Sequence, residues 1–448
     1  MMPRQAEGTL TAADESTTLV IPFVVPAGIR SFRLKFNYTP DHPEGAELRN
    51  QISASIYGPD GKTAEINRPD RWSDGVTVGP EPSGGVGAKI VSPGEWKLFI
   101  STHRVTSPDV HYTVDLDWHL PSDDVAPARV DITPLPDGWL RGDLHAHTWY
   151  SDGHWTTSAL ASFMFERGLD FSTLTDHNTI DGLPEFLSYD GTALTTLGGN
   201  EVSTFRGHML ALGVTDRLVD WRDPDGTLRP LPDIADEIHD AGGMAVICHP
   251  LSIGDPWCCG CRWEHEDMMP GNARAVEIWN GTWDDDKNGG GIKLWQTWLS
   301  EGHRLVATAG SDMHGPPQPA HLKRRAAHNV VYAIERGRDA VLKALKAGHS
   351  YVSAGPVCTL QAEENHQVWI MGDTVEASEP VTVTATWNGV PDGARLMLNV
   401  DGHPQPIPTS IQGVFETVLN PASFRWATLE VWDDEGALLV SNPIYGQR

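Results

Sequence analysis

Long apolar runs are missing from this 448-residue sequence, and none approaches the roughly 20 residues that a membrane-spanning helix needs. The first 25 residues also lack a basic segment followed by an apolar one, so no signal peptide is predicted. Their short apolar run, TLVIPFVV, is β-branched and contains a proline, which favours a strand. We therefore expect a cytoplasmic protein without membrane contact.

Positive charge is scarce, because 33 Lys and Arg residues stand against 60 Asp and Glu residues, for a net charge of −27. Proteins that coat nucleic acid need clustered Lys and Arg, so the sequence excludes that class. A small anionic substrate is not excluded. Bound metal ions can make a pocket locally positive even in an acidic protein.

Cysteine is scarce as well, and an odd number of cysteines predicts no disulfide framework. The five are Cys248, Cys258, Cys259, Cys261 and Cys358. Cys258 and Cys261 have the C-x-x-C spacing of half a zinc site or of a redox pair, and His265 is the only nearby candidate for a further ligand. A compact loop with free or paired thiols explains the same residues equally well.

The length predicts about three domains, and a hydrophobic content of 40% is enough for real cores. Residues 1–135 alternate short β-like runs with Gly/Pro turns, which predicts a β-sandwich. The Pro- and Asp-rich stretch 121–138 predicts a linker. The β pattern returns in residues 356–448, where we expect a second, small β-sandwich.

Residues 136–355 instead alternate strands with helices. Strands are expected in LRGDLHAHT, DFSTLTDHN, MAVICHP, RAVEIWN and RLVATAGSDMHG. Helices are expected in TTSALASFMFERGL after Thr caps, in LPDIADEIHDAGG and in IKLWQTWLSEG. This alternation predicts a parallel α/β fold, most simply a barrel.

Potential metal ligands stand at the ends of these strands, where α/β barrels build their sites. They are His145, His147, Asp152, His177, Glu201, His208, His249, Asp312 and His314. In His-Ala-His and Asp-Met-His the alternation of a strand points both outer side chains the same way. Each motif alone is weak evidence for a metal site. Because all of them occur in order within one α/β segment, a metal site is favoured over incidental histidines. Nine such groups suit two or three ions of Zn, Mn or Fe rather than one tetrahedral ion.

The segment 139–355 resembles the PHP (polymerase and histidinol phosphatase) superfamily of metallohydrolases. The motifs that carry the resemblance are DLHAHTWYSDG, LTDHNT, GNE, GH, CHP and GSDMH. VEIWNG and GIKLWQTWLSEGHRL are similar to the CehA/McbA-like branch, the one around carbaryl hydrolase. The resemblance implies a distorted TIM-like (β/α)7 barrel, here flanked by the two β-sandwich domains.

The resemblance also implies three ion sites. The first would use His145, His147, Glu201 and Asp312. The second would share Glu201 as a bridge and add His208 and His249. The third would use Asp152, His177 and His314. Two neighbouring ions would hold a hydroxide that attacks the substrate, so no Ser or Cys nucleophile is required.

Residues outside the ligand set are harder to assign. Phosphate substrates usually need a cation beyond the metal ions, and Arg206 or Arg262 could supply it, or could lie on the surface. Asn178 could orient the substrate or cap a helix, Asp176 is expected to support a ligand, and His154 to lie at a pocket edge or on the surface. The residues expected to act in the reaction are Glu201, Asp312, His314 and Arg206.

The Cys258–Cys261 loop is expected to help wall the site. Four tryptophans could line an apolar pocket or pack in the core, namely Trp257, Trp263, Trp279 and Trp283.

The leading functional hypothesis is a metal-dependent phosphoesterase that acts on a phosphodiester or a small organic phosphate. A carboxyl-ester or carbamate hydrolase with the same metal cluster is the first alternative, favoured by the carbaryl-hydrolase resemblance and by any Trp-lined pocket without an arginine. A non-catalytic binding protein is a third possibility, which the full ligand set disfavours. Nothing in the sequences of the two predicted β-sandwich domains indicates a ligand.

Overall fold

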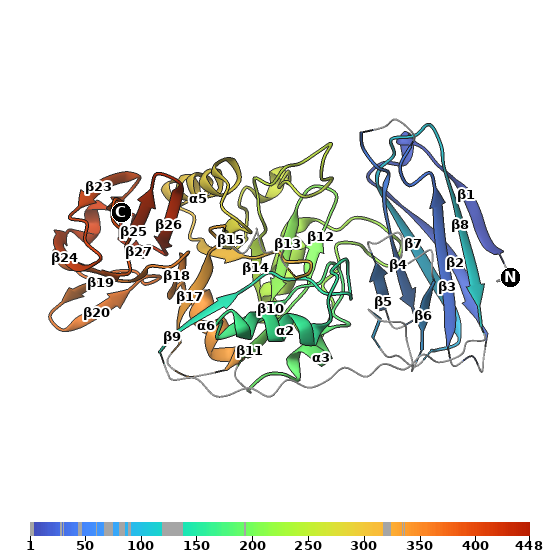
Figure 1. The fold of residues 1–448 in the computed structure, drawn as a ribbon, viewed down its shortest axis with the longest axis horizontal. Coiled ribbons are helices and arrows are strands. Elements are labelled where there is room, and N and C mark those ends of the chain that lie inside the picture. The colour runs from blue at the N-terminus through green and yellow to red at the C-terminus, as the bar shows by residue number, and fades with distance from the viewer. Residues whose placement is uncertain are drawn as a thin grey trace.

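The chain forms an elongated molecule in which an N-terminal β unit, a central α/β unit and a C-terminal β unit follow one another (Figure 1). The computed structural model describes residues 4–118 and 138–448 except 27–28, 30, 44–46, 60, 67–74, 80–85, 88–90, 192–193, 317–323, 334 and 336. The linker expected over 121–138 lies outside the described residues, apart from Gly138.

The N-terminal unit consists of two four-stranded antiparallel sheets, in the orders β1-β8-β3-β6 and β2-β7-β4-β5. Their strands are β1 (Arg4–Leu10), β2 (Thr17–Val25), β3 (Phe32–Thr39), β4 (Gln51–Gly58), β5 (Gly61–Ile66), β6 (Val76–Val78), β7 (Gly94–Arg104) and β8 (Val110–Asp117). Alternate residues of β3, such as Phe32 and Leu34, point inward, as the period of two in a strand requires. Both sheets contribute to one core, in which Phe32 meets Trp96 edge to face.

The central unit contains the expected alternation of strands and helices. Its strands are β9 (Gly138–Asp143), β10 (Phe171–Leu174), β11 (Thr195–Gly198), β12 (Glu201–Ser203), β13 (His208–Leu212), β14 (Met244–Ile247), β15 (Ala275–Asn280), β16 (Val306–Gly310), β17 (His328–Ala333) and β18 (Ser350–Ser353). Its helices are α2 (Thr157–Glu166), α3 (Leu183–Leu187), α4 (Leu231–Asp240), α5 (Gly290–Ser300) and α6 (Arg338–Ala347). The Thr cap expected for α2 is Thr156, whose side chain accepts a hydrogen bond from the Ala159 amide. Every helix in the described part of the chain is too short or too polar to cross a bilayer.

The expected parallel pairing holds for only part of the central unit. β9, β10 and β11 pair in parallel, and so do β14, β15 and β16. β12–β13, β13–β14 and β9–β17 are antiparallel, so the expectation of parallel strands throughout is wrong. Residues 204–207 alone connect β12 to β13, and a parallel crossover needs a dozen residues or more.

Two isolated bridges connect the two sheets of the central unit beyond their strand ends. Ala146, after β9, pairs with Met313, after β16. His177, after β10, pairs with Glu201 at the start of β12. The segments that carry the predicted ligands are therefore brought to one end of the central unit.

The C-terminal unit adds a sheet of its own, beginning at β19, and also continues the central sheet. Its strands are β19 (Val357–Glu364), β20 (Gln367–Ile370), β21 (Val381–Asn388), β22 (Arg395–Val400), β23 (His403–Ile407), β24 (Gln412–Leu419), β25 (Trp426–Asp433), β26 (Gly436–Ser441) and β27 (Ile444–Tyr445). β26 pairs with β18, so one ten-stranded sheet runs from β11 through β9 and β18 to β23. A second sheet, β20-β19-β21-β24, shares a core with the C-terminal end of this large sheet.

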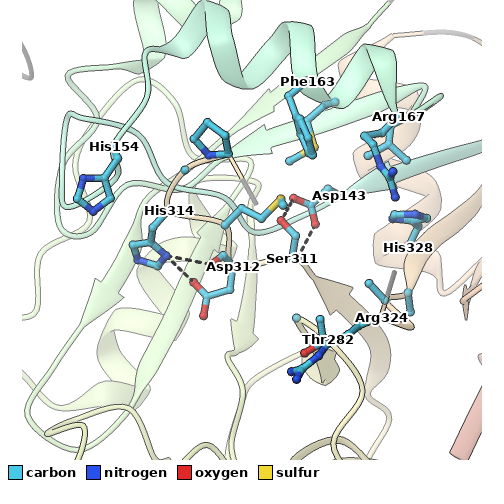
Figure 2. Close-up of a pocket in the computed structure, with 18 residues that line it drawn as sticks. Asp143, His154, Phe163, Arg167, Thr282, Ser311, Asp312, His314, Arg324 and His328 are labelled. Carbon is cyan, nitrogen blue, oxygen red and sulfur yellow. Dashed lines mark hydrogen bonds and ion pairs between the residues drawn. The ribbon is translucent and has the colours of Figure 1, made fainter. Parts of the chain in front are cut away.

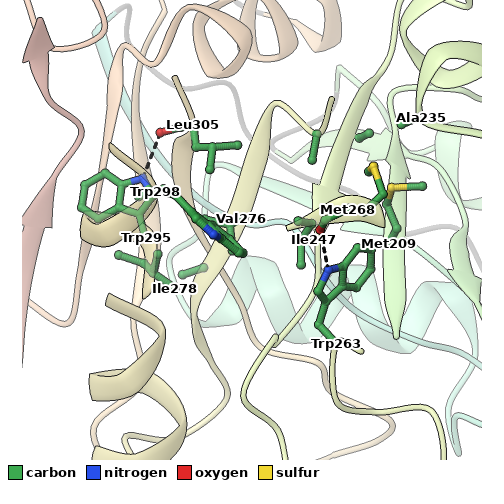
Figure 3. Packing of buried hydrophobic residues seen from close by; sticks show 14 of the residues in the cluster. Met209, Ala235, Ile247, Trp263, Met268, Val276, Ile278, Trp295, Trp298 and Leu305 are labelled. Carbon is green, nitrogen blue, oxygen red and sulfur yellow. Dashed lines mark hydrogen bonds between the residues drawn. The ribbon is translucent and has the colours of Figure 1, made fainter. Parts of the chain in front are cut away.

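Tryptophans pack the core between α5, the central sheet and the C-terminal unit (Figure 3). Trp295 is fully buried and its indole N–H donates to the Leu305 carbonyl at 2.9 Å. Trp263 and Trp279 are buried in the same core, and Trp283 packs against it. Trp257 is exposed. Three of the four tryptophans considered as pocket residues therefore belong to the core or its margin.

We expect Trp295→Ala to lower the free energy of unfolding by about 3–5 kcal/mol, because it leaves a large cavity in the core. Urea denaturation followed by circular dichroism measures this change. Trp257→Ala is the matched control and should change stability by less than about 0.5 kcal/mol, since its side chain is exposed. Equal effects of the two changes would contradict the packing described.

Candidate metal centre

All nine predicted ligands lie in one cluster at the end of the central unit. His145, His147 and Asp152 follow β9, His177 follows β10, Glu201 begins β12, His208 begins β13, His249 follows β14, and Asp312 and His314 follow β16. Most of these side chains are buried, and His145, His147 and Glu201 have no exposed surface. Residues up to 169 positions apart in the sequence thus share one site.

Glu201 is the centre of this cluster. Its Oε2 lies 3.2 Å from His145 Nε2, 3.3 Å from His147 Nε2 and 2.8 Å from His177 Nδ1. Its Oε1 lies 3.0 Å from His208 Nδ1 and 3.3 Å from His249 Nε2. One carboxylate therefore faces imidazoles on both of its oxygens, which is the arrangement a bridging ligand needs.

Two aspartates complete the cluster. Asp312 Oδ1 lies 3.0 Å from His147 Nε2 and 3.4 Å from His145 Nε2. Asp152 Oδ1 lies 3.2 Å from His314 Nε2 and 3.7 Å from His177 Nε2. His314 thus faces both aspartates, since its Nε2 lies near Asp152 and its Nδ1 lies 3.8 Å from Asp312 Oδ1.

The donor set fits divalent metal ions. Ligand atoms that share an ion at about 2.1 Å lie about 3.0–3.4 Å apart, which matches most of the distances around Glu201 and Asp312. His145 Nε2, His147 Nδ1 and Glu201 Oε2 are also buried without a hydrogen-bond partner. Unsatisfied buried polar atoms are costly, and ions bound to His145 Nε2 and Glu201 Oε2 would satisfy both.

The donors divide into overlapping groups whose atoms lie within 4.8 Å of one another. Four groups consist of predicted ligands alone: His145–His147–Glu201, His145–His249–Asp312, His177–Glu201–His208 and His147–Asp152–His177–His314; a fifth joins His145 to Cys248 and Glu277. The group His147–Asp152–His177–His314 contains the three residues expected at the third ion site and adds His147 to them. His249 groups with His145 and Asp312, whereas the resemblance implied that it pairs with His208.

The histidines and carboxylates of the cluster shift one another's pKa values. Burial opposes ionisation of Glu201, but the charges of His145, His177 and His208 hold its pKa well below the usual range. Burial also opposes the charge on His314, yet the Asp152 carboxylate raises its pKa to about 10. Burial lowers the pKa of His147 to about 3, and the charges of His314 and His177 act in the same direction. His147 therefore keeps a neutral ring, the form that binds metal.

Glu277 contacts two of the predicted ligands, although the ligand motifs do not include it. It lies in β15, where it is buried among apolar residues, and its Oε1 lies 3.1 Å from His145 Nδ1. Its Oε2 accepts hydrogen bonds from the His249 amide and the Asn280 side chain. Partners of this kind fix the orientation of a ligating imidazole. The one sequence signal was a carboxylate inside an apolar strand, since buried charges need a partner.

Asp176 and Asn178 support the site through the backbone. Asp176 accepts hydrogen bonds from the Thr148 amide and hydroxyl and from the Ser151 hydroxyl, so it holds the turn between His147 and Asp152. This fits the supporting role expected for it. Asn178 is buried and bonds the backbone N–H and C=O of Ser203, so it neither caps a helix nor lines a described cavity.

The backbone at the site is strained. His249 and Asp312 adopt positive φ angles of 26° and 52°, a region that non-glycine residues seldom occupy. Such conformations persist only where the surroundings enforce them, and they cluster at functional sites. Gly310, two residues before Asp312, has no room for a Cβ because Glu277 and His145 occupy the space.

The cysteine loop borders the site, as expected. Cys258 and Cys261 form a disulfide, which is one of the two interpretations of the C-x-x-C spacing. His265 takes no part in it, since its Nε2 contacts the Thr204 hydroxyl at 2.8 Å. The Cys261 carbonyl lies 3.0 Å from His249 Nδ1, so this loop holds His249 with its Nε2 toward Glu201.

One cavity at the site, of about 310 Å³, lies between the metal-ligand cluster and the N-terminal unit. Asp152, His177 and His208 line it on the central side. Eight N-terminal residues line it as well, namely Tyr38, Asp41, Arg49, Asn50, Gln51, Ile52, Ser53 and His103. Nothing in the sequence signals this contribution, because it depends on how the two units dock.

A second cavity, of about 450 Å³, borders Asp312 and His314 on another side (Figure 2). Apolar side chains such as Phe163 contribute to it, and His154 lies at its edge, one of the two places expected for that residue. Arg167 and His328 lie opposite His314 in this view.

The arginines that the sequence suggested as substrate ligands lie elsewhere. Arg206 and Arg262 are exposed, and neither lines the cavity beside the N-terminal unit or the one beside Asp312. The expectation that Arg206 acts in the reaction therefore finds no support in its position. Arg206 lies between Glu201 and His208 in the sequence and Arg262 follows His249, but both side chains face solvent.

Comparisons with known proteins give partial structural similarity. Neither a search against family models nor a search of curated proteins finds a match. A two-domain protein from Bacteroides vulgatus that contains a predicted PHP-like metal-dependent phosphoesterase is 17% identical, with 71% of this chain and 100% of that chain covered and a TM-score of 0.41.

Two further solved structures cover less of the chain. An amidohydrolase from Chromobacterium violaceum, solved with sulfate and no metal, is 19% identical over 39% of this chain and 88% of its own, with a TM-score of 0.30. A Bifidobacterium adolescentis protein named as a metal-dependent phosphoesterase is 19% identical over 40% and 89%, with a TM-score of 0.28. Similarity of this extent assigns no activity, so function is inferred from the side chains of the site.

We expect Glu277→Gln to weaken Mn²⁺ binding about 10–100-fold, because it disturbs the orientation of His145 without removing a ligand. Calorimetric titration of the metal-free protein measures the affinity. Glu430→Gln is the matched control, since Glu430 is a buried carboxylate of the C-terminal unit far from the ligands. Unchanged affinity in Glu277→Gln would show that Glu277 does not support the metal centre.

We also expect Mn²⁺ to raise the thermal unfolding midpoint of metal-free protein, because ions bind the folded cluster and not the unfolded chain. At a hundred times the dissociation constant, this linkage contributes about 2.7 kcal/mol. Differential scanning fluorimetry with and without EDTA measures the shift. Glu201→Gln should abolish it, and a full shift in that variant would mean that the ions bind elsewhere.

Proposed function

We propose that this protein is a metal-dependent hydrolase and that phosphate esters, diesters or small organic phosphates, are its substrates. The observation that carries the proposal is the buried cluster of six histidines and three carboxylates centred on Glu201. Imidazole and carboxylate together suit Mn, Zn or Fe, and the number of donors suits two or three ions.

The proposed ion sites keep the three sets that the resemblance implies, and the contacts on the two oxygens of Glu201 support the first two. His145, His147, Glu201 and Asp312 would hold one ion, and His208 and His249 would hold a second with Glu201 between the two. Asp152, His177 and His314 would hold a third. Divalent ions in such a site supply Lewis acidity and lower the pKa of a water molecule toward neutrality.

The chain itself would keep the ligands in order. Glu277 would hold the proton on Nδ1 of His145, so that Nε2 is free to bind. The Cys261 carbonyl would do the same for His249. Burial of Glu201 keeps bulk water from the centre, which strengthens every electrostatic interaction made there.

We also propose that the central unit is a distorted (β/α)7 barrel of the PHP superfamily, similar to its CehA/McbA-like branch, and that the flanking units are β-sandwiches. The motifs and the convergence of the strand ends on one site support the barrel. The shared core of the two N-terminal sheets supports a sandwich there.

A second candidate function is hydrolysis of carboxyl esters or carbamates by the same centre. The apolar side chains of the cavity in Figure 2 favour it, since they could hold an aromatic leaving group. The Trp-lined pocket that would have supported this function more strongly is not seen, because none of the tryptophans that the structure describes lines the cavity beside the N-terminal unit or the one in Figure 2.

The test compares three substrates with Mn²⁺-reconstituted protein: bis-(p-nitrophenyl) phosphate, p-nitrophenyl phosphate and 1-naphthyl N-methylcarbamate. We expect turnover of a phosphate ester. His145→Ala should reduce it by more than the roughly 10–100-fold that loss of an outer partner costs, because it removes a ligand. His111→Ala, an exposed histidine of β8, is the control and should retain full activity.

Each result separates the candidate functions. Turnover of the carbamate alone would favour the second function. Wild-type turnover by a His145→Ala variant with full metal content would contradict the metal-centre assignment. A protein that binds the metal and hydrolyses none of the three substrates would not support a general phosphoesterase.

A further inference from the structure

The cavity between the metal-ligand cluster and the N-terminal unit has walls from two parts of the chain. On one wall, Asp152, His177 and His208 present side chains that belong to two of the proposed ion sites. The other wall comes from Tyr38 of β3, from Asp41, from residues 49–53 at the start of β4, and from His103 at the end of β7. A molecule that reaches the ions through this cavity therefore contacts the N-terminal unit.

This second wall is held firmly in place. The buried guanidinium of Arg104 contacts Asp255 at 3.1 Å and Cys259 Sγ at 2.6 Å, across the boundary between the two units. Gln51 accepts a hydrogen bond from the Cys259 amide, and the rings of His103 and Phe205 meet edge to face at 5.0 Å. The cavity wall is thus a docked surface and not a loose approach of two domains.

Arg222 anchors the same interface further from the cavity. Its side chain is wholly buried, and it donates hydrogen bonds to Ser101, Ser55 and Tyr57 of the N-terminal unit. A buried guanidinium that reaches three partners in another unit costs several kcal/mol to disrupt. The relative position of the two units is therefore well determined.

Arg49 is the only Lys or Arg among the described residues that line this cavity. Its ion-pair partner, Asp41, lies 3.6 Å away, and the side chains of Arg49 and Asp41 are 71% and 42% exposed. Such surface pairs contribute little free energy, so the guanidinium can exchange Asp41 for a ligand. A guanidinium binds carboxylate or phosphate through two parallel N–H bonds.

We infer that the N-terminal unit forms one wall of the substrate cavity and that Arg49 binds a second anionic group of the substrate. This inference rests on the proposed phosphoesterase function. The phosphate ester occupies the metal end, and a carboxylate or further phosphate on the same molecule reaches Arg49. The substrate class is therefore a small organic phosphate with two anionic groups, and the N-terminal unit selects it.

The test uses phosphonates, which bind like phosphates but are not hydrolysed. Methylphosphonate has one anionic group, whereas phosphonoacetate and 3-phosphonopropionate add a carboxylate at increasing distance. Each is titrated calorimetrically into Mn²⁺-loaded full-length protein after removal of free metal. We expect one carboxylate-bearing probe to bind wild type at least about tenfold more tightly than methylphosphonate, because a charge-assisted bond is added.

Arg49→Ala should remove this preference and leave methylphosphonate binding unchanged, and Arg49→Lys should restore part of it. Arg395→Ala, an exposed arginine paired with Asp434 in the C-terminal unit, is the matched control and should keep the wild-type preference. If Arg167→Ala removes the preference and Arg49→Ala does not, the second anion lies in the cavity of Figure 2 and the inference is wrong.

Failure of the inference and failure of the proposed function give different results. If wild type binds methylphosphonate and Arg49→Ala alters all three probes equally or none, the phosphoesterase proposal stands and the role of Arg49 is refuted. If metal-loaded wild type binds none of the probes, the phosphate-ester function fails, and the inference fails with it. Metal content of every variant is measured in parallel.

Discussion

The buried carboxylate of Glu201 is the charge on which the site depends. An ionised carboxylate without exposed surface costs several kcal/mol unless it is paired on all sides. Five imidazoles surround it, from His145, His147, His177, His208 and His249. These come from four separate segments of the central unit, so satisfying this one charge requires the ends of β9, β10, β13 and β14 to converge.

The next layer of contacts keeps this arrangement from relaxing. Glu277 holds His145 and the backbone of His249, while Asp176 holds the turn that carries Asp152. His249 and Asp312 adopt strained backbone angles in these positions. Strain and buried polar groups of this kind are unfavourable for stability alone, which is why their concentration at one place indicates chemistry.

The three parts of the chain also contribute differently to the site. The central unit supplies every proposed metal ligand, whereas the N-terminal unit closes a cavity above them through the Arg104 and Arg222 contacts. The C-terminal unit extends the central sheet through β18 and β26 and shares the tryptophan-rich core around α5. It stabilises the scaffold and provides no residue to either cavity at the ligands.

The sequence alone determined what depends on local pattern. The alternation in His-Ala-His and Asp-Met-His, the Thr156 cap and the strand–helix order all follow from the periods and capping preferences of strands and helices, and together with the family resemblance they indicated the nine proposed ligands. Tertiary structure decided what depends on contacts between distant segments: the antiparallel pairing of β12 to β14, the support from Glu277, the burial of Trp279 and the arrival of Arg49 at the site. The period of a strand or helix does not predict these four features, because each depends on which distant surfaces pack together and exclude water.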